Sequence, residues 1–115
     1  MSFTHTISEK LNYTLISIGG RLIEKNEAGP LISEVENLIT SGKIKFVIDG
    51  ETLEYMNSSG LAVLLNVLTK ARNAGGEAVL CHLSKKVKQL FIITKLTSVY
   101  SVVDSFKEAE EKFKN

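Results

Sequence analysis

The sequence predicts an α/β fold: a mixed, mainly parallel β-sheet that starts with an antiparallel hairpin and carries about four α-helices. Three observations support this prediction. Short apolar runs rich in β-branched residues alternate with longer segments whose apolar residues recur at helical spacing. Two strand-like segments come first, with only a short turn between them. The later strand–helix–strand units need crossover connections, which make their strands parallel.

The expected elements follow from polarity patterns and from the residues that end them. In chain order they are strand 3–8, strand 13–18, a helix from about 26 to 41, strand 44–48, helix 58–74, strand 77–82, helix 84–95, strand 99–103 and a helix from 104 onward. Gly19 and Gly20 end the hairpin. Pro30 fits only in the first turn of a helix, and Gly42 is typical of the position just after a helix end.

Hydroxyl side chains mark the starts of later helices. Ser58 or Ser59 precedes an almost wholly apolar run and can accept a hydrogen bond from an unpaired first-turn N–H. Ser105 and Glu108 have the spacing of a capping box. The loop at Ser58 joins a buried strand to a helix, and in open α/β sheets such strand ends are where ligands and partners meet the protein.

The helix expected over 84–95 has a polar and an apolar side. Ser84 caps it, and Ile93 or Thr94 continues an inward apolar stripe. Lysines occupy its first turn, at positions 85, 86 and 88. We interpret them as a solvated face, with an edge that meets an acidic partner as the alternative.

Composition restricts the classes of function. The chain of 115 residues has a net charge of +1, which argues against direct binding to nucleic acid or to an anionic membrane. No apolar run reaches transmembrane length and no signal-peptide pattern is visible, so we expect a cytoplasmic protein without membrane insertion. Cys81 is the only cysteine, which precludes an intrachain disulfide and a cysteine-based zinc site. We interpret it as a small buried residue.

No catalytic motif is recognisable. Ser58 is preceded by Met56 and Asn57 and lacks the flanking glycine before a hydrolase nucleophile, and the two histidines, His5 and His82, have no evident acid partner. Phosphate-binding glycine loops and metal-binding clusters are not visible either. We therefore expect no catalytic residue, no cofactor and no metal. A small hydrolase that uses Ser58 stays as an alternative.

Four segments resemble one family. In chain order they are Gly20-Arg21-Leu22, the run from Asp49 through Leu53 to Tyr55-Met56-Asn57-Ser58-Ser59-Gly60-Leu61, Ala74-Gly75-Gly76-Glu77, and Val87-Lys88-Gln89-Leu90-Phe91. They resemble the signature of the STAS domain, in particular of the bacterial anti-sigma factor antagonists. The match spans nearly the whole chain, so residues 1–115 are expected to form a single STAS domain with the mixed sheet described above.

The resemblance implies a phosphorylation switch. In this family the unphosphorylated protein binds an anti-sigma factor that is also a serine kinase, and so releases a sigma factor. Phosphorylation of the serine after the motif's Asp breaks the complex, and a phosphatase restores it. By motif position the acceptor is Ser58. The expected partner-binding residues are Asn57, Ser58, Ser59, Gly60 and Ile23. A purely structural role for Ser58 or Ser59 as N-cap stays as the alternative.

Two departures from the family pattern affect this expectation. Asn57 replaces the Asp before the acceptor serine, and Ile23 stands where an Asp often follows Gly-x-Leu. Both remove negative charge near the expected docking edge. An alternative function is therefore a STAS scaffold or accessory subunit, not phosphorylated, in a signalling or membrane transport complex. In either case we expect a monomer or weak dimer.

Overall fold

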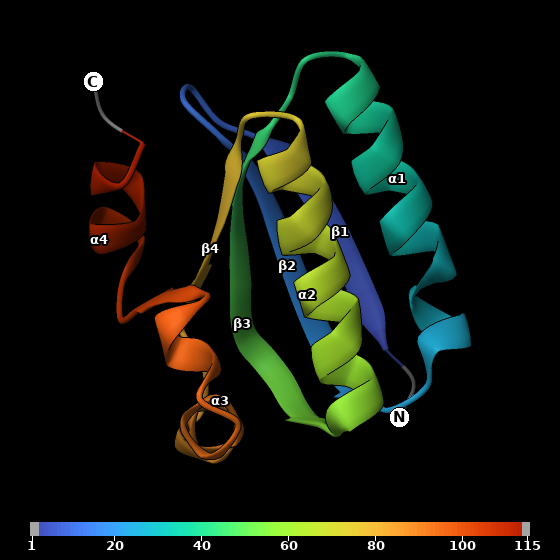
Figure 1. Cartoon of the computed structure of the whole chain (residues 1–115), viewed down its shortest axis with the longest axis vertical. Coiled ribbons are helices and arrows are strands. Elements are labelled where there is room, and N and C mark those ends of the chain that lie inside the picture. Colours follow the sequence, from blue (N-terminus) through green and yellow to red (C-terminus); the bar gives the residue numbers. More distant parts are fainter. Residues whose placement is uncertain (1–2, 114–115) are drawn as a thin grey trace.

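The computed structural model describes residues 3–113, which form one five-stranded sheet with helices on both faces (Figure 1). The strands are β1 (Thr4–Glu9), β2 (Thr14–Leu22), β3 (Lys45–Met56), β4 (Glu77–Cys81) and β5 (Ser101–Val103). They lie in that order across the sheet. β1 pairs antiparallel with β2, and every other neighbouring pair is parallel. The predicted mixed sheet with its initial hairpin is confirmed.

Four α-helices connect and follow the strands. They are α1 (Gly29–Thr40), α2 (Ser58–Asn73), α3 (Lys85–Ile93) and α4 (Phe106–Glu111), and short 3-10 helices occupy Lys25–Ala28 and Leu96–Ser98. In Figure 1, α1 and α2 lie side by side on one side of the sheet, and α4 lies on the other. The end of β3 leads directly into α2, so this strand end is covered by the start of a helix.

Two apolar clusters hold these layers together. The larger packs α1, α2 and α3 against the sheet, and its fully buried members include Phe46 and Ile48 of β3. The smaller packs α4 against the other face and contains Val47 and Cys81. Successive side chains of a strand point to opposite faces, which is why neighbouring residues of β3 belong to different clusters. The predicted burial of Cys81 is confirmed.

The residues predicted to start and end helices largely do so. Pro30 lies in the first turn of α1, which begins after a 3-10 turn rather than near residue 26. Gly42 follows α1 with a φ of 91°, in the left-handed region where a glycine costs least. Ser84 caps α3 by accepting from Val87 N–H at 3.2 Å. Ser105 accepts from the N–H of Glu108, as the capping-box spacing predicted.

The predicted ends of two strands are wrong. The strand expected over 13–18 does not end before Gly19 but continues to Leu22, and the strand expected over 44–48 runs on to Met56. Leu22 pairs with Met56, so the parallel pairing of β2 with β3 continues to the ends of both strands. The pairing has two register shifts along the way. The exposed residues in the added part of β3 are mostly polar. A search for apolar runs therefore does not predict that this part is a strand.

The last strand is shorter than the predicted 99–103. It begins at Ser101, because Tyr100 still belongs to the turn that closes the preceding 3-10 helix, where its N–H donates to Leu96 O at 2.8 Å. β5 therefore has only three residues.

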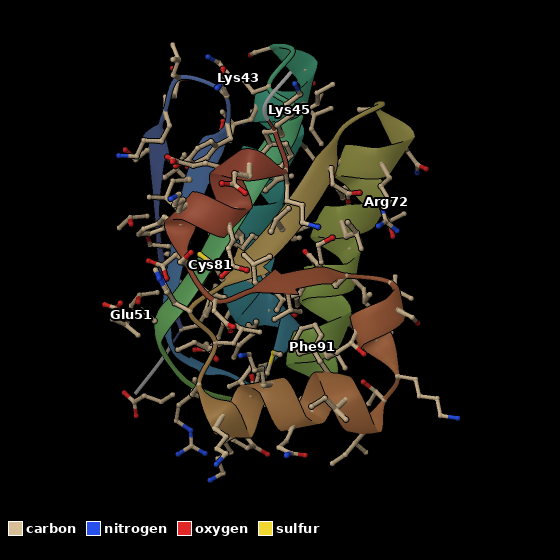
Figure 2. All side chains as sticks on the ribbon, turned by 90° about the vertical axis from the view of Figure 1, so that its left-hand side faces the viewer. Lys43, Lys45, Glu51, Arg72, Cys81 and Phe91 are labelled. Atoms are coloured by element: carbon tan, nitrogen blue, oxygen red, sulfur yellow. The ribbon has the colours of Figure 1, made fainter. Side chains whose placement is uncertain are left out.

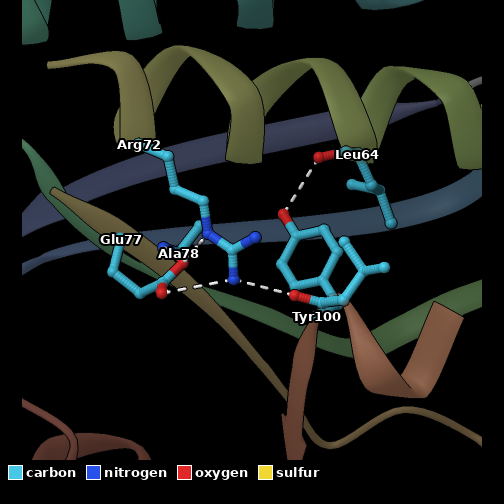
Figure 3. A network of polar contacts seen from close by, with 6 residues as sticks. Leu64, Arg72, Glu77, Ala78 and Tyr100 are labelled. Atoms are coloured by element: carbon cyan, nitrogen blue, oxygen red, sulfur yellow. Dashed lines mark hydrogen bonds and ion pairs between the residues drawn. The ribbon is translucent and has the colours of Figure 1, made fainter. Parts of the chain in front are cut away.

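Polar contacts fasten this turn to α2 (Figure 3). The buried Tyr100 hydroxyl donates to Leu64 O at 3.0 Å, and burial raises the pKa of Tyr100 well above its usual value. Arg72 donates from Nη2 to Val99 O at 2.8 Å and from Nε to Glu77 Oε1 at 3.0 Å. These contacts connect α2 to the segment just before β5 and to the first residue of β4, and so hold the helix that carries Ser58 in place.

Candidate functional site

Ser58 is the first residue of α2 and is exposed. The prediction that Ser58 or Ser59 caps this helix is wrong, because Asn57 is the N-cap. Its extended backbone (φ −114°, ψ −167°) lets its Oδ1 accept from Gly60 N–H at 3.1 Å. An Asn oxygen is at least as good a cap as a hydroxyl. The Ser58 hydroxyl is therefore not used to start the helix.

Asn57 also joins α2 to the end of β2. Its Nδ2 donates to Ile23 O at 3.2 Å, and its backbone N–H donates to Leu22 O at 3.4 Å. Gly60 completes this contact, since a Cβ there would lie 2.2 Å from Leu22 O. The structure thus brings all five predicted partner-binding residues together where β2 and β3 end: Ile23, Asn57, Ser58, Ser59 and Gly60.

Two substitutions of Asn57 separate its two side-chain hydrogen bonds. Asn57→Ala removes both, and we expect the free energy of unfolding to fall by about 1–2 kcal/mol, as for other lost N-caps. Asn57→Asp keeps the cap and adds a negative charge at the helix N-terminus, but it cannot donate to Ile23 O. We expect Asn57→Asp to lower the free energy of unfolding by less than half as much as Asn57→Ala. Urea unfolding at pH 7 measures both, and equal losses would contradict this assignment.

A shallow pocket of about 280 Å³ lies beside Ser58. β3 and the start of α2 form one wall, and α3 forms the other. Its lining residues are Tyr55, Met56, Asn57, Ser58, Lys86, Val87, Gln89, Leu90 and Ile93. Ile93 is 73% exposed and Thr94 is exposed too, so the prediction that one or the other continues the inward stripe of α3 is wrong. Ile93 follows Phe91 by two residues, which turns it about 200° away from that buried side chain.

The surface near Ser58 is apolar and cationic. The Arg21 guanidinium lies 5.3 Å from the centre of the Tyr55 ring, and the Lys86 ammonium lies 6.0 Å from it. Both distances suit cation–π contacts. The first-turn N–H groups of α2 add the positive end of the helix dipole. Sequence reasoning had interpreted Lys86 as part of a solvated face and had missed Tyr55, because only the fold brings α3 next to the end of β3.

The histidines do have acid partners, contrary to the sequence-based expectation. His82 Nδ1 lies 3.1 Å from Asp49 Oδ1, and His5 Nε2 lies 2.7 Å from Glu34 Oε1. Within residues 3–113, neither ring forms a hydrogen bond with a serine. Burial, with help from nearby carboxylates, raises the pKa of the Cys81 thiol to about 12, which disfavours a reactive thiolate.

The sequence from residue 6 to residue 109 matches the family model of the STAS domain. The chain belongs to the STAS domain family. This STAS protein is 31% identical over 106 residues to BtrV of Bordetella bronchiseptica, which is named an anti-sigma factor antagonist; the match covers 92% of this chain and 91% of BtrV. The similarity places it in the anti-sigma factor antagonist family.

Solved structures confirm the fold of this STAS protein. An anti-sigma factor antagonist from Mycobacterium paratuberculosis superposes with a TM-score of 0.81 at 16% identity, over 99% of this chain and 96% of the other. The Bacillus cell fate determinant SpoIIAA in its phosphorylated form superposes with a TM-score of 0.74 at 17% identity, over 96% and 100%. In the described part of the chain, no helix combines the length and apolarity needed to span a bilayer.

Proposed function

We propose that this STAS protein binds an anti-sigma factor of the serine-kinase type and is released from it by phosphorylation of Ser58. Binding of the unphosphorylated protein to the anti-sigma factor frees the sigma factor, phosphorylation ends this binding, and a phosphatase restores the binding form. The observation that carries the proposal is the placement of Ser58: exposed, at a helix N-terminus, and not used in the cap. The protein would act in the cytoplasm as a binding module without catalysis of its own and without direct contact to nucleic acid.

Electrostatics explain how one phosphoryl group could act as a switch. A phosphoserine carries a charge of about −1.5 to −2 near neutral pH. The N-terminus of α2 can stabilise that charge within the folded protein. The same charge, placed beside the apolar rim of Tyr55 and Ile93, opposes any partner surface that is apolar or acidic. Binding could thus change while the fold stays the same.

The Asn at position 57 bears on how a kinase would recognise the site. Asn57 keeps the size and the cap of the family's Asp but carries no charge. Its second hydrogen bond, to Ile23 O, requires an amide and cannot be made by a carboxylate. We infer that the loop before α2 is held by a hydrogen bond in this protein, and that its kinase tolerates a neutral residue before the acceptor.

A second candidate function is favoured by the missing charges at Asn57 and Ile23. A STAS scaffold or accessory subunit of a signalling or membrane transport complex would keep the docking edge and never be phosphorylated. The scaffold hypothesis predicts a partner that stays bound whether or not ATP is present. Under both hypotheses the protein is a monomer or weak dimer that exposes the surface where β2 and β3 end.

A pull-down from host lysate with and without Mg-ATP distinguishes the two. We expect ATP to release a kinase-like partner and to add one phosphoryl group to the bait, which fragment mass analysis would assign to Ser58. Ser58→Ala bait should keep its partner in ATP. A partner that remains bound to wild-type bait of unchanged mass would contradict the switch and support the scaffold.

A further inference from the structure

Asp49 and Cys81 lie opposite each other on neighbouring parallel strands. They are register partners of β3 and β4, so their side chains point to the same face of the sheet. This is the face that α4 covers, and Figure 2 shows Cys81 there, with Glu51 farther along β3. The Asp49 carboxylate is held in place by the N–H of Glu51, which donates to Oδ1 at 3.0 Å.

His82 completes the group through its unusual backbone. Consecutive residues of an extended strand point to opposite faces, so His82 would normally turn away from Cys81. Its φ of 58° places it in the left-handed region, and its ring returns to the side of Cys81 and Asp49. His82 Nδ1 lies 3.1 Å from Asp49 Oδ1 and 3.8 Å from Cys81 Sγ. The rings of His82 and Phe106 form a T-shaped pair, with centroids 4.6 Å apart.

The geometry does not suit a catalytic relay. A relay needs the thiol at one ring nitrogen and the carboxylate at the other, whereas here both approach Nδ1. Three different donor atoms that lie close to one another suit a metal ion instead. The Asp49, Cys81 and His82 donor atoms all lie within 4.8 Å of one another.

We propose, contrary to the sequence-based expectation of no metal and no cysteine-based zinc site, that Asp49, Cys81 and His82 form a binding site for a thiophilic divalent cation, Zn²⁺ in the first place. Zinc prefers thiolate, imidazole and carboxylate ligands in tetrahedral geometry. From its usual bond lengths, the ligand atoms should be about 3.4 Å apart for N and O, and about 3.6 Å apart for S and N. The observed 3.1 Å and 3.8 Å differ from these by a few tenths of an ångström.

Binding needs one proton to leave. The Cys81 thiol gives its proton to solvent as the S–Zn bond forms, because a coordinating thiol is deprotonated. Nδ1 of neutral His82 turns its lone pair to the metal, and the carboxylate exchanges its contact with His82 for a bond to the ion. Side-chain exposures of 16% for Asp49 and 23% for His82 leave an approach from solvent. Water takes the fourth position.

The experiment uses the full chain without a histidine tag. Zn²⁺ affinity is measured by competition with a chromogenic chelator, and Co²⁺ is added as a spectroscopic probe of thiolate coordination. We expect one equivalent of Zn²⁺ to bind and Co²⁺ to give a near-ultraviolet thiolate band. His82→Asn should weaken Zn²⁺ binding by about 100-fold or more, since even partners behind a metal ligand contribute 10–100-fold. Asn tolerates the left-handed backbone, so this variant should fold.

His5→Asn is the matched control, because His5 also faces a carboxylate but has no cysteine beside it. It should bind Zn²⁺ as the wild type does. Cys81→Ser should lose the Co²⁺ band. The proposal is overturned if wild-type protein takes up no Zn²⁺, if folded His82→Asn protein binds it equally well, or if His5→Asn weakens binding as much as His82→Asn.

Discussion

In the Ser58→Asp protein, the affinity for the anti-sigma factor is expected to fall by about 100-fold or more, while the fold remains stable. An acidic side chain at this position repels acidic groups of a partner that docks where β2 and β3 end, or leaves the partner's groups there buried without a counterpart. Such effects can cost about 2–5 kcal/mol of binding free energy. The fold tolerates the change because Ser58 is exposed and a negative charge at a helix N-terminus is favourable.

Calorimetry with the partner identified by the pull-down measures this effect. Ser58→Ala should bind as tightly as the wild type and should no longer respond to Mg-ATP. Asn73→Asp adds a negative charge at the other end of α2, about 22 Å away along the helix, and should leave the affinity nearly unchanged. Normal binding by folded Ser58→Asp protein would refute the switch.

Gly76→Ala is expected to lower the free energy of unfolding by about 3 kcal/mol or more. A Cβ on Gly76 would lie 1.8 Å from Ile44 O and 2.7 Å from Ile44 Cβ, so the clash is with backbone as well as side chain. The N–H of the next residue, Glu77, donates to the same Ile44 O at 3.0 Å. Moving Gly76 away would therefore open the start of the β3–β4 ladder too.

Gly42→Ala is the matched control for this substitution. Gly42 also follows a helix and has a φ of 91°, but no atom lies within 4 Å of its added Cβ. Only backbone strain of about 1–2 kcal/mol is expected there. Urea unfolding of both variants compares the two effects, and a loss at Gly76 no larger than that at Gly42 would show that the turn can move without cost.

The sheet and its helix boundaries could be predicted because local chemistry determines them. Pro30, Ser84 and Ser105 each have a conformational or hydrogen-bonding preference that acts within one turn of chain. The apolar strands at Phe46 and Val79 have β-branched or aromatic residues that suit a buried sheet. Their order, with helices between, leaves parallel pairing as the simplest topology.

The features that the sequence did not predict depend on contacts between residues far apart in the chain. Asn57 became the N-cap because it also binds Ile23 O, 34 residues earlier, which no local rule for serine caps includes. His82 meets Asp49 across two strands, 33 residues apart. Spacing alone assigned Ile93 or Thr94 to the inward stripe, although both are exposed and Ile93 lies in the pocket beside Ser58.

The strand order has a consequence for how the protein is made. Every strand pairs with the strand that precedes it in the chain, so each new element can add to a sheet already begun. No connection between successive strands is longer than 22 residues, and each crossover connection consists largely of helix. Closing such local connections costs less entropy than pairing strands that are far apart in the chain. A chain that emerges from the ribosome with its N-terminus first can therefore build the hairpin, then β3 and then β4. The docking edge at Ser58 would form before α4 closes the opposite face.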